Sequence, residues 1–218
     1  MLQRRLEPEV METAQDAADY DAIDHREVNQ RFVDDLRPQL TGDVELLDLG
    51  TGTAQIPILL CQACPQVRIL AVDLAESMLE LGRRNVAAAG LEQRVELQRI
   101  DCKRLPYRDG QFSGVISNSI VHHIPDPAKV LDEAVRVVAP GGLIFFRDLL
   151  RPADQQQLDG LVECYTVGST ARQRQLFDDS LHAALALDEI RSLVAALGFS
   201  PHTVAATSDR HWTWCARR

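Results

Sequence analysis

The sequence predicts an α/β fold: a doubly wound, mostly parallel sheet with helices on both faces and an antiparallel hairpin strand at the C-terminal edge. Three observations lead to this prediction. Short apolar runs alternate with helical segments between residues 44 and 147, which is typical of parallel strands joined by helical crossovers. A glycine-rich turn follows the first run. Two final β-like runs are only five residues apart, too close for a crossover helix, so they predict a hairpin.

The expected elements follow one another along the chain as strand, helix, strand. Strands are expected at 44–48, 68–72, 94–100, 112–117 and 143–147. Helices are expected at 53–63, 75–89, 127–138 and 188–197, on the basis of helical spacing of apolar residues and of Gly198 as a C-terminal cap. The two terminal β-like runs are 201–206 and 212–216.

A single domain in four parts is expected from the changes in pattern. An acidic helical cap occupies residues 1–42, the alternating core 43–148, a helical insertion 149–186, and a helix with the β-hairpin 187–218. The insertion contains two polar helices, at 153–165 and 171–184. We expect it to lie over the carboxyl ends of the strands, where open α/β sheets bind ligands.

Composition excludes several classes of protein. The 23 Lys and Arg against 32 Asp and Glu give a net charge of −9, which disfavours nucleic acid and anionic membranes as partners. No apolar run is long enough to span a bilayer, and the N-terminus lacks the apolar core of a signal peptide. Five dispersed cysteines favour a reduced, cytoplasmic protein.

Polar residues end four consecutive strands of the predicted sheet. The first strand runs into Asp48-Leu49-Gly50-Thr51-Gly52-Thr53, where glycines allow a tight turn and a helix N-terminus faces a ligand. Asp73, about 20 residues further on, is placed to accept hydrogen bonds from the ribose of an adenosine cofactor. Asp101 and Asn118 end the third and fourth strands. The sequence therefore predicts an adenosine-cofactor site at this rim.

The charges around the glycine turn favour one adenosine cofactor over another. A dinucleotide site continues to a third glycine, and here that position is Gln55. Asp48 would repel a pyrophosphate, but it suits a ligand that carries an ammonium and a sulfonium group. The pattern thus favours S-adenosylmethionine over NAD.

Four blocks of the sequence resemble a known family. They are residues 44–53, 71–79, 118–127 and 137–143. Together they make residues 44–148 similar to the class I S-adenosylmethionine-dependent methyltransferases, in particular the small-molecule group, whose core is Rossmann-like. One departure is Ala54, where the family often has a third glycine. The resemblance implies S-adenosylmethionine as cofactor and S-adenosylhomocysteine as product.

The resemblance also implies roles for individual residues. The implied cofactor-binding residues are Asp48, Gly50, Thr51, Gly52, Asp73, Leu74, Met78, Asp101, Cys102, Asn118, Ser119 and Tyr20. The loop from Asp48 would contact the methionine part, Asp73 the ribose, and Asp101 the adenine amino group. Asn118 and Ser119 would lie beside the sulfonium. Two competing interpretations stay open: Asp73 as an acid that begins the following helix, and Tyr20 as part of a solvated helix.

Several residues after the strand ends are candidates on the acceptor side. His122 is the candidate catalytic residue, as a general base or as a group that orients the acceptor, and lining of the pocket is the competing interpretation for it and for His123. Arg147 and Asp148 either bind a polar substrate or pair with each other. No metal ligand set is identifiable, so no metal is expected. Cys61 and Cys64 are assigned to helix packing, despite their redox-like spacing.

The predicted function is methyl transfer from S-adenosylmethionine to a small-molecule acceptor by in-line displacement. The charged leaving group is already activated, so holding the reactants in line supplies much of the rate. The motifs of amino-methylating DNA enzymes and of cytosine C5 enzymes are absent from the sequence. The alternative is a non-catalytic S-adenosylmethionine-binding or regulatory protein, and a third reading, an NAD-linked oxidoreductase, is disfavoured by Gln55. The acceptor, the methylated atom and the oligomeric state are not predicted.

Overall fold

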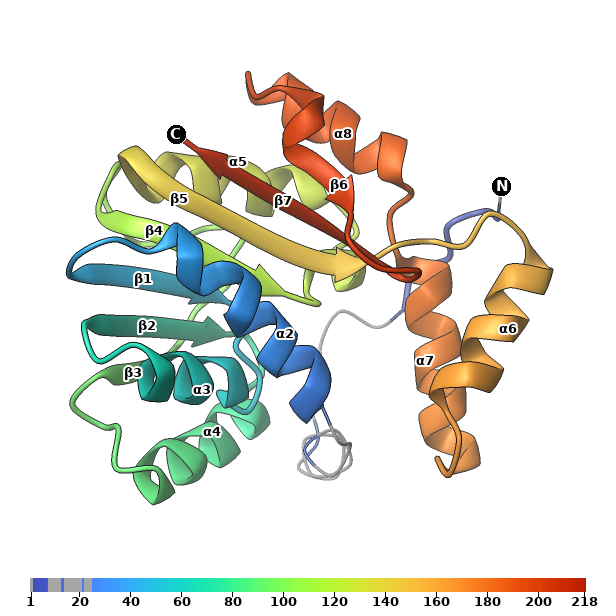
Figure 1. Cartoon of the computed structure of the whole chain (residues 1–218), viewed down its shortest axis with the longest axis horizontal. Helices are drawn as coiled ribbons and strands as arrows, with labels where there is room; N and C mark the ends of the chain where they lie inside the picture. The colour runs from blue at the N-terminus through green and yellow to red at the C-terminus, as the bar shows by residue number, and fades with distance from the viewer. Residues whose placement is uncertain (1, 8–12, 14–20, 22–24) are drawn as a thin grey trace. The chain divides into compact units, whose positions relative to one another are not determined.

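The computed structural model of the chain describes residues 2–7, 13, 21 and 25–218. Its strands form a seven-stranded sheet in the order β3-β2-β1-β4-β5-β7-β6 (Figure 1). They are β1 (Val44–Leu49), β2 (Val67–Asp73), β3 (Val95–Arg99), β4 (Phe112–Asn118), β5 (Val138–Leu149), β6 (Val204–Ala206) and β7 (His211–Arg217). β1 pairs in parallel with β2 and β4, whereas β6 and β7 are antiparallel. The predicted fold class is therefore confirmed, including the hairpin.

The helices connect these strands in the expected alternation. They are α2 (Arg26–Leu36), α3 (Gln55–Ala63), α4 (Glu76–Ala88), α5 (Pro127–Val137), α6 (Gln155–Tyr165), α7 (Ala171–Ala183) and α8 (Leu187–Ala196). In Figure 1, α2, α3 and α4 lie in front of the strands and α5 lies behind them. Across the described ranges, no helix combines the length and the apolar character needed to cross a membrane.

The chain divides into two compact units. The smaller unit comprises Met1–Glu9, Ser119–Ala128 and Arg147–Trp214, and the larger unit comprises Val10–Asn118, Lys129–Phe146 and Cys215–Arg218. Each unit therefore combines segments that are distant in sequence. One of the boundaries between the units falls immediately after Asn118, at the end of β4.

The larger unit has a continuous apolar core between its helices and strands. Phe32, Val33 and Leu36 of α2 are fully buried, as the helical spacing of these apolar residues requires. The ring of Phe32 meets that of Phe145 edge to face at 5.1 Å, a favoured aromatic geometry. This packing fixes α2 beside the strands whose ends carry the predicted cofactor residues.

Several element boundaries differ from the prediction. Pro201–Thr203 forms a 3-10 helix, so β6 begins at Val204 rather than at residue 201. Backbone geometry explains two further differences. α3 begins at Gln55 rather than at residue 53, because Ala54 has a φ of 63° and occupies the left-handed region, a conformation that cannot lie inside a right-handed helix. β5 begins at Val138 rather than at residue 143. The strand includes the turn at Gly141 and Gly142 because this turn pairs with Arg218. The N–H of Gly141 donates to the carbonyl of Arg218, and the N–H of Arg218 donates to the carbonyl of Gly142.

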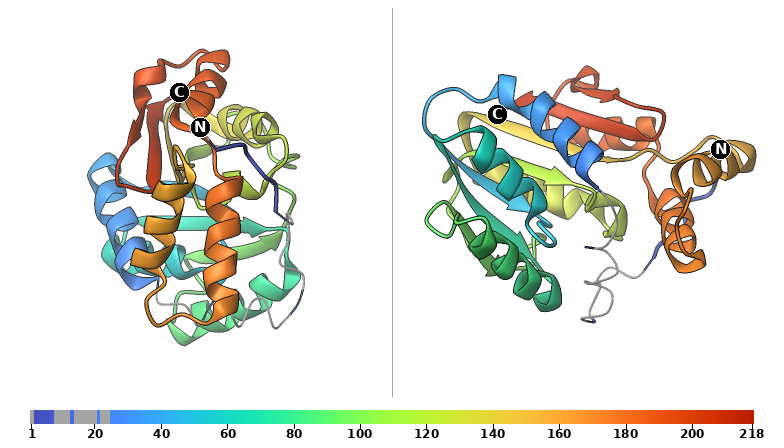
Figure 2. Two further views of the ribbon diagram at one scale, coloured as in Figure 1. Left: turned by 90° about the vertical axis from the view of Figure 1, so that its right-hand side faces the viewer. Right: turned by 60° about the horizontal axis from the view of Figure 1, so that its bottom comes forward.

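The smaller unit contains two helices that pack side by side, α6 and α7, as the left view of Figure 2 shows. Asp154 caps α6 through the backbone N–H of Gln157, and Thr170 with Gln173 forms a capping box on α7. Such caps satisfy N–H groups that a helix start leaves free. The apolar residues Leu158, Leu161, Val162 and Leu181 bury the contact between the two helices.

Candidate functional site

The glycine turn after β1 is held against the end of β2. The N–H groups of Gly50 and Thr51 both donate to the carbonyl of Val72, at 2.8 and 3.0 Å. Gly50 and Gly52 have φ values of 71° and 55°, a backbone conformation that glycine adopts without strain. α4 approaches this turn closely at Gly82, where a Cβ atom would lie 3.4 Å from the carbonyl oxygen of Gly52. The turn is thus rigidly placed at the rim of the sheet.

Asp48 is a buried carboxyl at the end of β1, with 3% of its surface exposed. Burial raises its pKa to about 7, the hydroxyl of Thr51 lowers it, and the negative charge of Asp73 raises it further. A buried carboxyl of this kind is costly to ionise unless a cation lies nearby. The site therefore favours a positively charged ligand group next to Asp48.

Asp73 ties the glycine turn to the start of α4. Its Oδ2 accepts from the N–H of Gly52 at 2.8 Å, and its Oδ1 accepts from the N–H of Ala75 at 2.9 Å. Asp73 therefore binds the backbone just before α4, which agrees with its interpretation as an acid that begins this helix. Its carboxylate can also accept from a ribose, because a carboxylate accepts several hydrogen bonds. Leu74 is half-buried beside it, and Met78 of α4 is buried.

Asp101 follows β3 and pairs with its neighbour Lys103. Its Oδ1 lies 2.9 Å from the Lys103 ammonium and accepts from the Lys103 backbone N–H. Burial alone would raise the pKa of Asp101, but these contacts lower it below its usual value, so the carboxylate is ionised at neutral pH. Cys102 next to it is buried.

Among the buried polar atoms at this rim, Thr53 Oγ1 in the glycine turn and Asn118 Oδ1 at the end of β4 have no hydrogen-bond partner within the described ranges. Buried polar atoms are almost always satisfied in native proteins, so these two suit a bound polar molecule. Together with Asp48, they fit a cofactor that carries an ammonium group and hydroxyl groups.

Gln55 has a structural role that the sequence analysis missed. Its side chain accepts from Asn29 Nδ2 at 3.0 Å and donates to Asp21 Oδ1 at 2.9 Å. Asn85 of α4 adds a hydrogen bond to the carbonyl of Thr53 at 3.1 Å. This polar network links α2, α3 and α4 around the glycine turn, and no periodicity in the sequence indicates it.

In the smaller unit, the two histidines after β4 form a separate polar cluster. His122 Nδ1 donates to Asp148 Oδ1 at 2.5 Å. Asp148 also accepts from the backbone N–H groups of Val121 and Leu149. Burial alone would lower the pKa of His122, but Asp148 and then Glu7 raise it above its usual value. Asp148, for its part, has a lowered pKa, because its contact with His122 outweighs the effect of burial.

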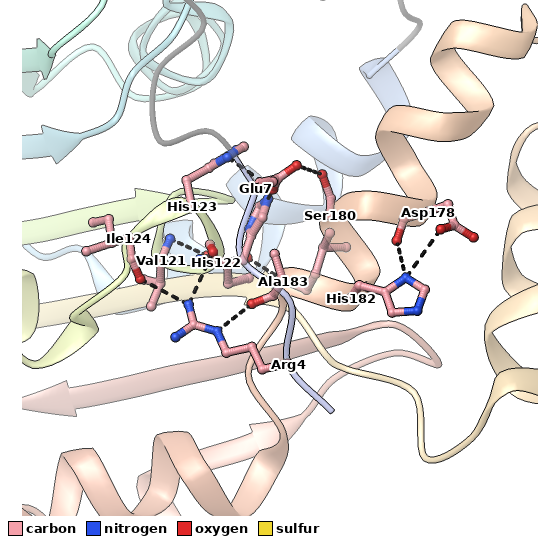
Figure 3. Close-up of polar contacts among 12 residues, drawn as sticks. Arg4, Glu7, Val121, His122, His123, Ile124, Asp178, Ser180, His182 and Ala183 are labelled. Atoms are coloured by element: carbon pink, nitrogen blue, oxygen red, sulfur yellow. Dashed lines mark hydrogen bonds and ion pairs between the residues drawn. The ribbon is translucent and has the colours of Figure 1, made fainter. Parts of the chain in front are cut away.

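Glu7 reaches the same histidines from the N-terminal segment (Figure 3). Its Oε1 lies 3.1 Å from His123 Nδ1 and 3.5 Å from His122 Nε2, and Ser180 of α7 donates to its Oε2 at 3.2 Å. Burial alone would raise the pKa of Glu7, but the two imidazoles and the hydroxyl lower it. Figure 3 also shows that His182 points away from this cluster and pairs with Asp178.

The structure places the predicted residues as follows. Asp48, Gly50, Thr51, Gly52 and Asp73 come together around the glycine turn. Ser119 is in the left-handed region, with a φ of 58°, and donates its N–H to the carbonyl of Arg147. Tyr20 lies outside the described residues. Cys61 and Cys64 are buried in the apolar core, as expected for packing residues.

Glu7 and Ser180 are functional candidates that the sequence did not reveal. They lie in segments 173 positions apart in the sequence, and neither segment contains a recognisable motif. For Arg147 and Asp148, substrate binding and mutual pairing are the two interpretations that the sequence leaves open. In the structure Arg147 donates to Thr213 at 2.9 Å, and Asp148 accepts from His122.

The known proteins that the chain resembles in sequence are methyltransferases. Residues 47–146 match the family model described as a methyltransferase domain. The chain is 31% identical to the demethylmenaquinone methyltransferase of Thermus thermophilus over 169 residues, which are 71% of this chain and 74% of that protein. It is 27% identical to the 27-O-demethylrifamycin SV methyltransferase of Amycolatopsis mediterranei, over 83% of this chain and 64% of that protein.

Other curated relatives match only the core of the fold. The demethylmenaquinone methyltransferase of Symbiobacterium thermophilum is 32% identical over 49% of this chain and 43% of its own length. The chain thus spans about half the length of several curated relatives that it matches.

Solved structures share the fold at low sequence identity. A SAM-dependent methyltransferase from Aquifex aeolicus has a TM-score of 0.68 at 16% identity, over 94% of this chain and 98% of that chain. The [4+2]-cyclase SpnF has a TM-score of 0.61 at 16% identity, over 100% of this chain and 99% of that chain.

Proposed function

Because the chain belongs to the class I S-adenosylmethionine-dependent methyltransferases, we propose that it transfers the methyl group of this cofactor to a small-molecule acceptor by in-line displacement. The observation that carries the proposal is the pair of carboxyls at the ends of β1 and β2, which meet around the glycine turn. The names of the relatives, which refer to a demethylated menaquinone and a demethylated rifamycin, support a small organic acceptor.

The cofactor brings a methyl group on a positively charged sulfur atom that leaves as a neutral thioether. In the proposed complex, Asp48 and the glycine turn hold the ammonium end and Asp73 accepts from the ribose hydroxyls. Leu74 and Met78 pack on the adenine, and Asp101 with its neighbour Cys102 contacts the adenine edge. Asn118 and Ser119 orient the sulfonium end. These residues hold the reacting atoms in line, which is the main contribution that this chemistry requires from a protein.

His122 is the proposed catalytic residue on the acceptor side. Asp148 accepts from His122 Nδ1, so Nε2, which lies 3.5 Å from Glu7 Oε1, is the ring nitrogen that would contact an acceptor in place of Glu7. A buried carboxylate behind an imidazole orients the ring and stabilises the imidazolium that forms when the ring takes a proton. An acceptor that carries a hydroxyl or another weakly acidic group would need such a base.

The first experiment is a thermal shift of dialysed protein with S-adenosylmethionine, S-adenosylhomocysteine and NAD. Ligand at 100 times its dissociation constant stabilises the folded state by about 2.7 kcal/mol. We expect a shift with both sulfur ligands, none with NAD, and a much smaller shift in Asp73→Ala. Asp43→Ala, at an exposed position before β1, is the matched control and should behave as the wild type.

Turnover separates the proposal from its alternative. Methyl transfer to a panel that begins with a demethylmenaquinone analogue would support the enzyme. Cofactor binding without transfer to any acceptor would favour a non-catalytic S-adenosylmethionine-binding or regulatory protein. The fold alone does not decide this question, because the same fold occurs in a protein named as a cyclase. The absence of any shift with either sulfur ligand would contradict both versions.

A further inference from the structure

The cluster of Glu7, His122 and His123 in the smaller unit has the composition of a metal site. One carboxylate oxygen and two imidazole nitrogens, one from each residue, all lie within 4.8 Å of one another. The three side chains come from the N-terminal segment and from the turn after β4 and point toward one another (Figure 3). Two histidines and one carboxylate are a common ligand set for zinc.

Two of the three distances between the ligand atoms are close to those of a zinc centre. Zinc bonds to nitrogen and oxygen are about 2.0–2.2 Å, so two ligand atoms of a tetrahedral site lie roughly 3.3–3.5 Å apart. Glu7 Oε1 lies 3.1 Å from His123 Nδ1 and 3.5 Å from His122 Nε2. Small movements of the side chains are enough to place one ion between the three atoms.

The geometry of the contact between Glu7 and His123 favours a metal ion bound by both side chains over a hydrogen bond between them. Within the described residues, Glu7 Oε1 and His123 Nδ1 are buried, and neither makes a well-directed hydrogen bond despite their short separation. A simple ion pair would align the N–H with the oxygen. A metal ion bound by both atoms would not require the N–H to point at the oxygen.

Groups behind the ligands hold them in the orientation that a metal requires. His122 Nδ1 donates to Asp148 Oδ1, and this carboxylate–histidine arrangement is the usual support of a zinc-bound imidazole. Ser180 donates to the second oxygen of Glu7, at 3.2 Å. Two of the three ligands therefore have the outer contacts that metal sites use to fix ring orientation and charge.

The N-terminal segment that carries Glu7 is anchored in place by its neighbours. The guanidinium of Arg4 donates to the carbonyl oxygens of Ala183, His122 and Ile124, at 2.7, 3.2 and 3.0 Å. Backbone hydrogen bonds also join Leu2 to Ala153 and Arg5 to His182. Glu7 is thus presented to the histidines by a fixed segment, and such preorganisation favours binding.

The charges of the surroundings are compatible with a divalent cation. Glu7 and Asp148 place two carboxylates against the histidine pair. Arg4 is the positive group that opposes them. Its guanidinium is directed at backbone carbonyls rather than at the carboxylates, which leaves both carboxylates for the ion and its ligands.

We propose that Glu7, His122 and His123 bind one zinc ion and leave a fourth coordination position open. No metal is expected from the sequence, because Glu7 is far from the two histidines along the chain and no motif connects them. Zinc binding does not depend on the proposed function. One consequence does: His122 Nε2 cannot bind the metal and accept a proton from an acceptor at the same time, so zinc-loaded protein should lose methyl transfer that needs this base.

The test uses full-length protein without a histidine tag, freed of metal with a chelator. Cobalt is titrated as a spectroscopic probe, since a tetrahedral cobalt site absorbs visible light strongly, and zinc is then added to displace it. Cys164→Ser serves as the background, because this thiol is exposed and would bind metal by itself. We expect one cobalt ion per chain with a tetrahedral spectrum, and its displacement by one equivalent of zinc.

Matched variants assign the ligands. Glu7→Gln and His123→Asn should each weaken zinc binding by about 100-fold or more, since even outer contacts to a ligand are worth 10–100-fold. Ser180→Ala should weaken it by about 10-fold. Glu163→Gln on α6 and His202→Asn, both at exposed positions of the smaller unit, repeat the same chemical changes away from the cluster and should leave the affinity unchanged. Circular dichroism shows whether each variant is folded.

The outcomes separate a metal site from an ion pair and from the proposed function. An octahedral spectrum, more than one weak site, or affinity unchanged in folded Glu7→Gln would overturn the proposal and leave a buried ion pair. A tetrahedral site without any methyl transfer would retain the metal site and contradict the enzyme. Tight zinc binding that leaves transfer unaffected would retain the site and exclude His122 as the base.

Discussion

Among single residues, Asp48 has an ionisation that the fold alters strongly. Its pKa is raised to about 7 in the folded protein, whereas an aspartate in an unfolded chain titrates near 3.9. The folded state therefore holds the proton more tightly. By linkage, this carboxyl contributes stability that is fully present below about pH 4 and is lost as the pH rises through about 7.

Asp48→Asn, which resembles the protonated carboxyl, tests this linkage. Between pH 5 and pH 8, the free energy of unfolding of the wild type should fall relative to that of Asp48→Asn by about 2–3 kcal/mol, at 1.36 kcal/mol for each pKa unit. Urea denaturation of ligand-free protein at both pH values measures the difference. Asp43→Asn, at an exposed position, is the control, and an equal difference at pH 5 and pH 8 would contradict the raised pKa.

The sequence indicates the site residues that end strands, but it does not indicate those that depend on contacts between distant segments. Asp48, Asp73 and Asn118 are predictable because each ends a strand, and parallel strands bring their carboxyl ends to one rim. Glu7 is not predictable, because its position depends on Arg4, whose contact with His122 joins residues 118 positions apart. Such contacts leave no periodic trace in a single sequence.

Among the elements, two glycines differ in the space around them: a side chain would clash at Gly142 but not at Gly160. A Cβ atom at Gly142 in β5 would lie 2.8 Å from the carbonyl oxygens of Ala139 and Ser113, closer than atoms can pack. A Cβ atom at Gly160 in α6 would meet nothing within 4 Å. The first glycine is required by packing, and the second only weakens its helix.

Alanine at each position should therefore act in opposite directions. Gly142→Ala should lower the free energy of unfolding by about 2 kcal/mol or more, as overpacking of a strand turn does. Gly160→Ala should raise it by about 0.5–1 kcal/mol, the helix propensity that glycine lacks. Denaturant titrations of both variants measure the two changes, and a stabilising Gly142→Ala would show that the turn relaxes more easily than its contacts indicate.

Element types are well predicted here, and element ends less so. The strands and helices of the core appear in the predicted order because apolar periodicity reflects burial. The start of α3 is displaced because Ala54 adopts a left-handed backbone, which sequence pattern does not indicate for alanine. The start of β5 is displaced by hydrogen bonds from Arg218, which are set by the fold as a whole.

For the whole molecule, the cysteines provide a measure of how the chain is packed. Cys61, Cys64 and Cys102 are buried, Cys215 is partly covered and Cys164 is exposed. Burial raises the pKa of Cys61 to about 11 and raises that of Cys215, and only the thiolate reacts rapidly. The five thiols should therefore differ strongly in reactivity.

Titration with a thiol reagent of the folded protein at pH 8 should modify one cysteine rapidly and a second one slowly. The other three should react only after denaturation. Cys164→Ser should remove the rapid phase and leave the slow one. Rapid modification of three or more thiols in the native protein would show that the core opens far more often than this packing implies.

The hydrogen bond between Ser180 and Glu7 joins residues that are 173 positions apart, and this has a consequence for synthesis on the ribosome. Glu7 is synthesised 173 residues before its partner on α7. Domains fold as their sequence becomes available, so the glutamate has no Ser180 to bind while the residues between them are translated. Its histidine cluster is therefore completed late, after α7 has left the exit tunnel, and messages truncated before that point yield chains that lack it.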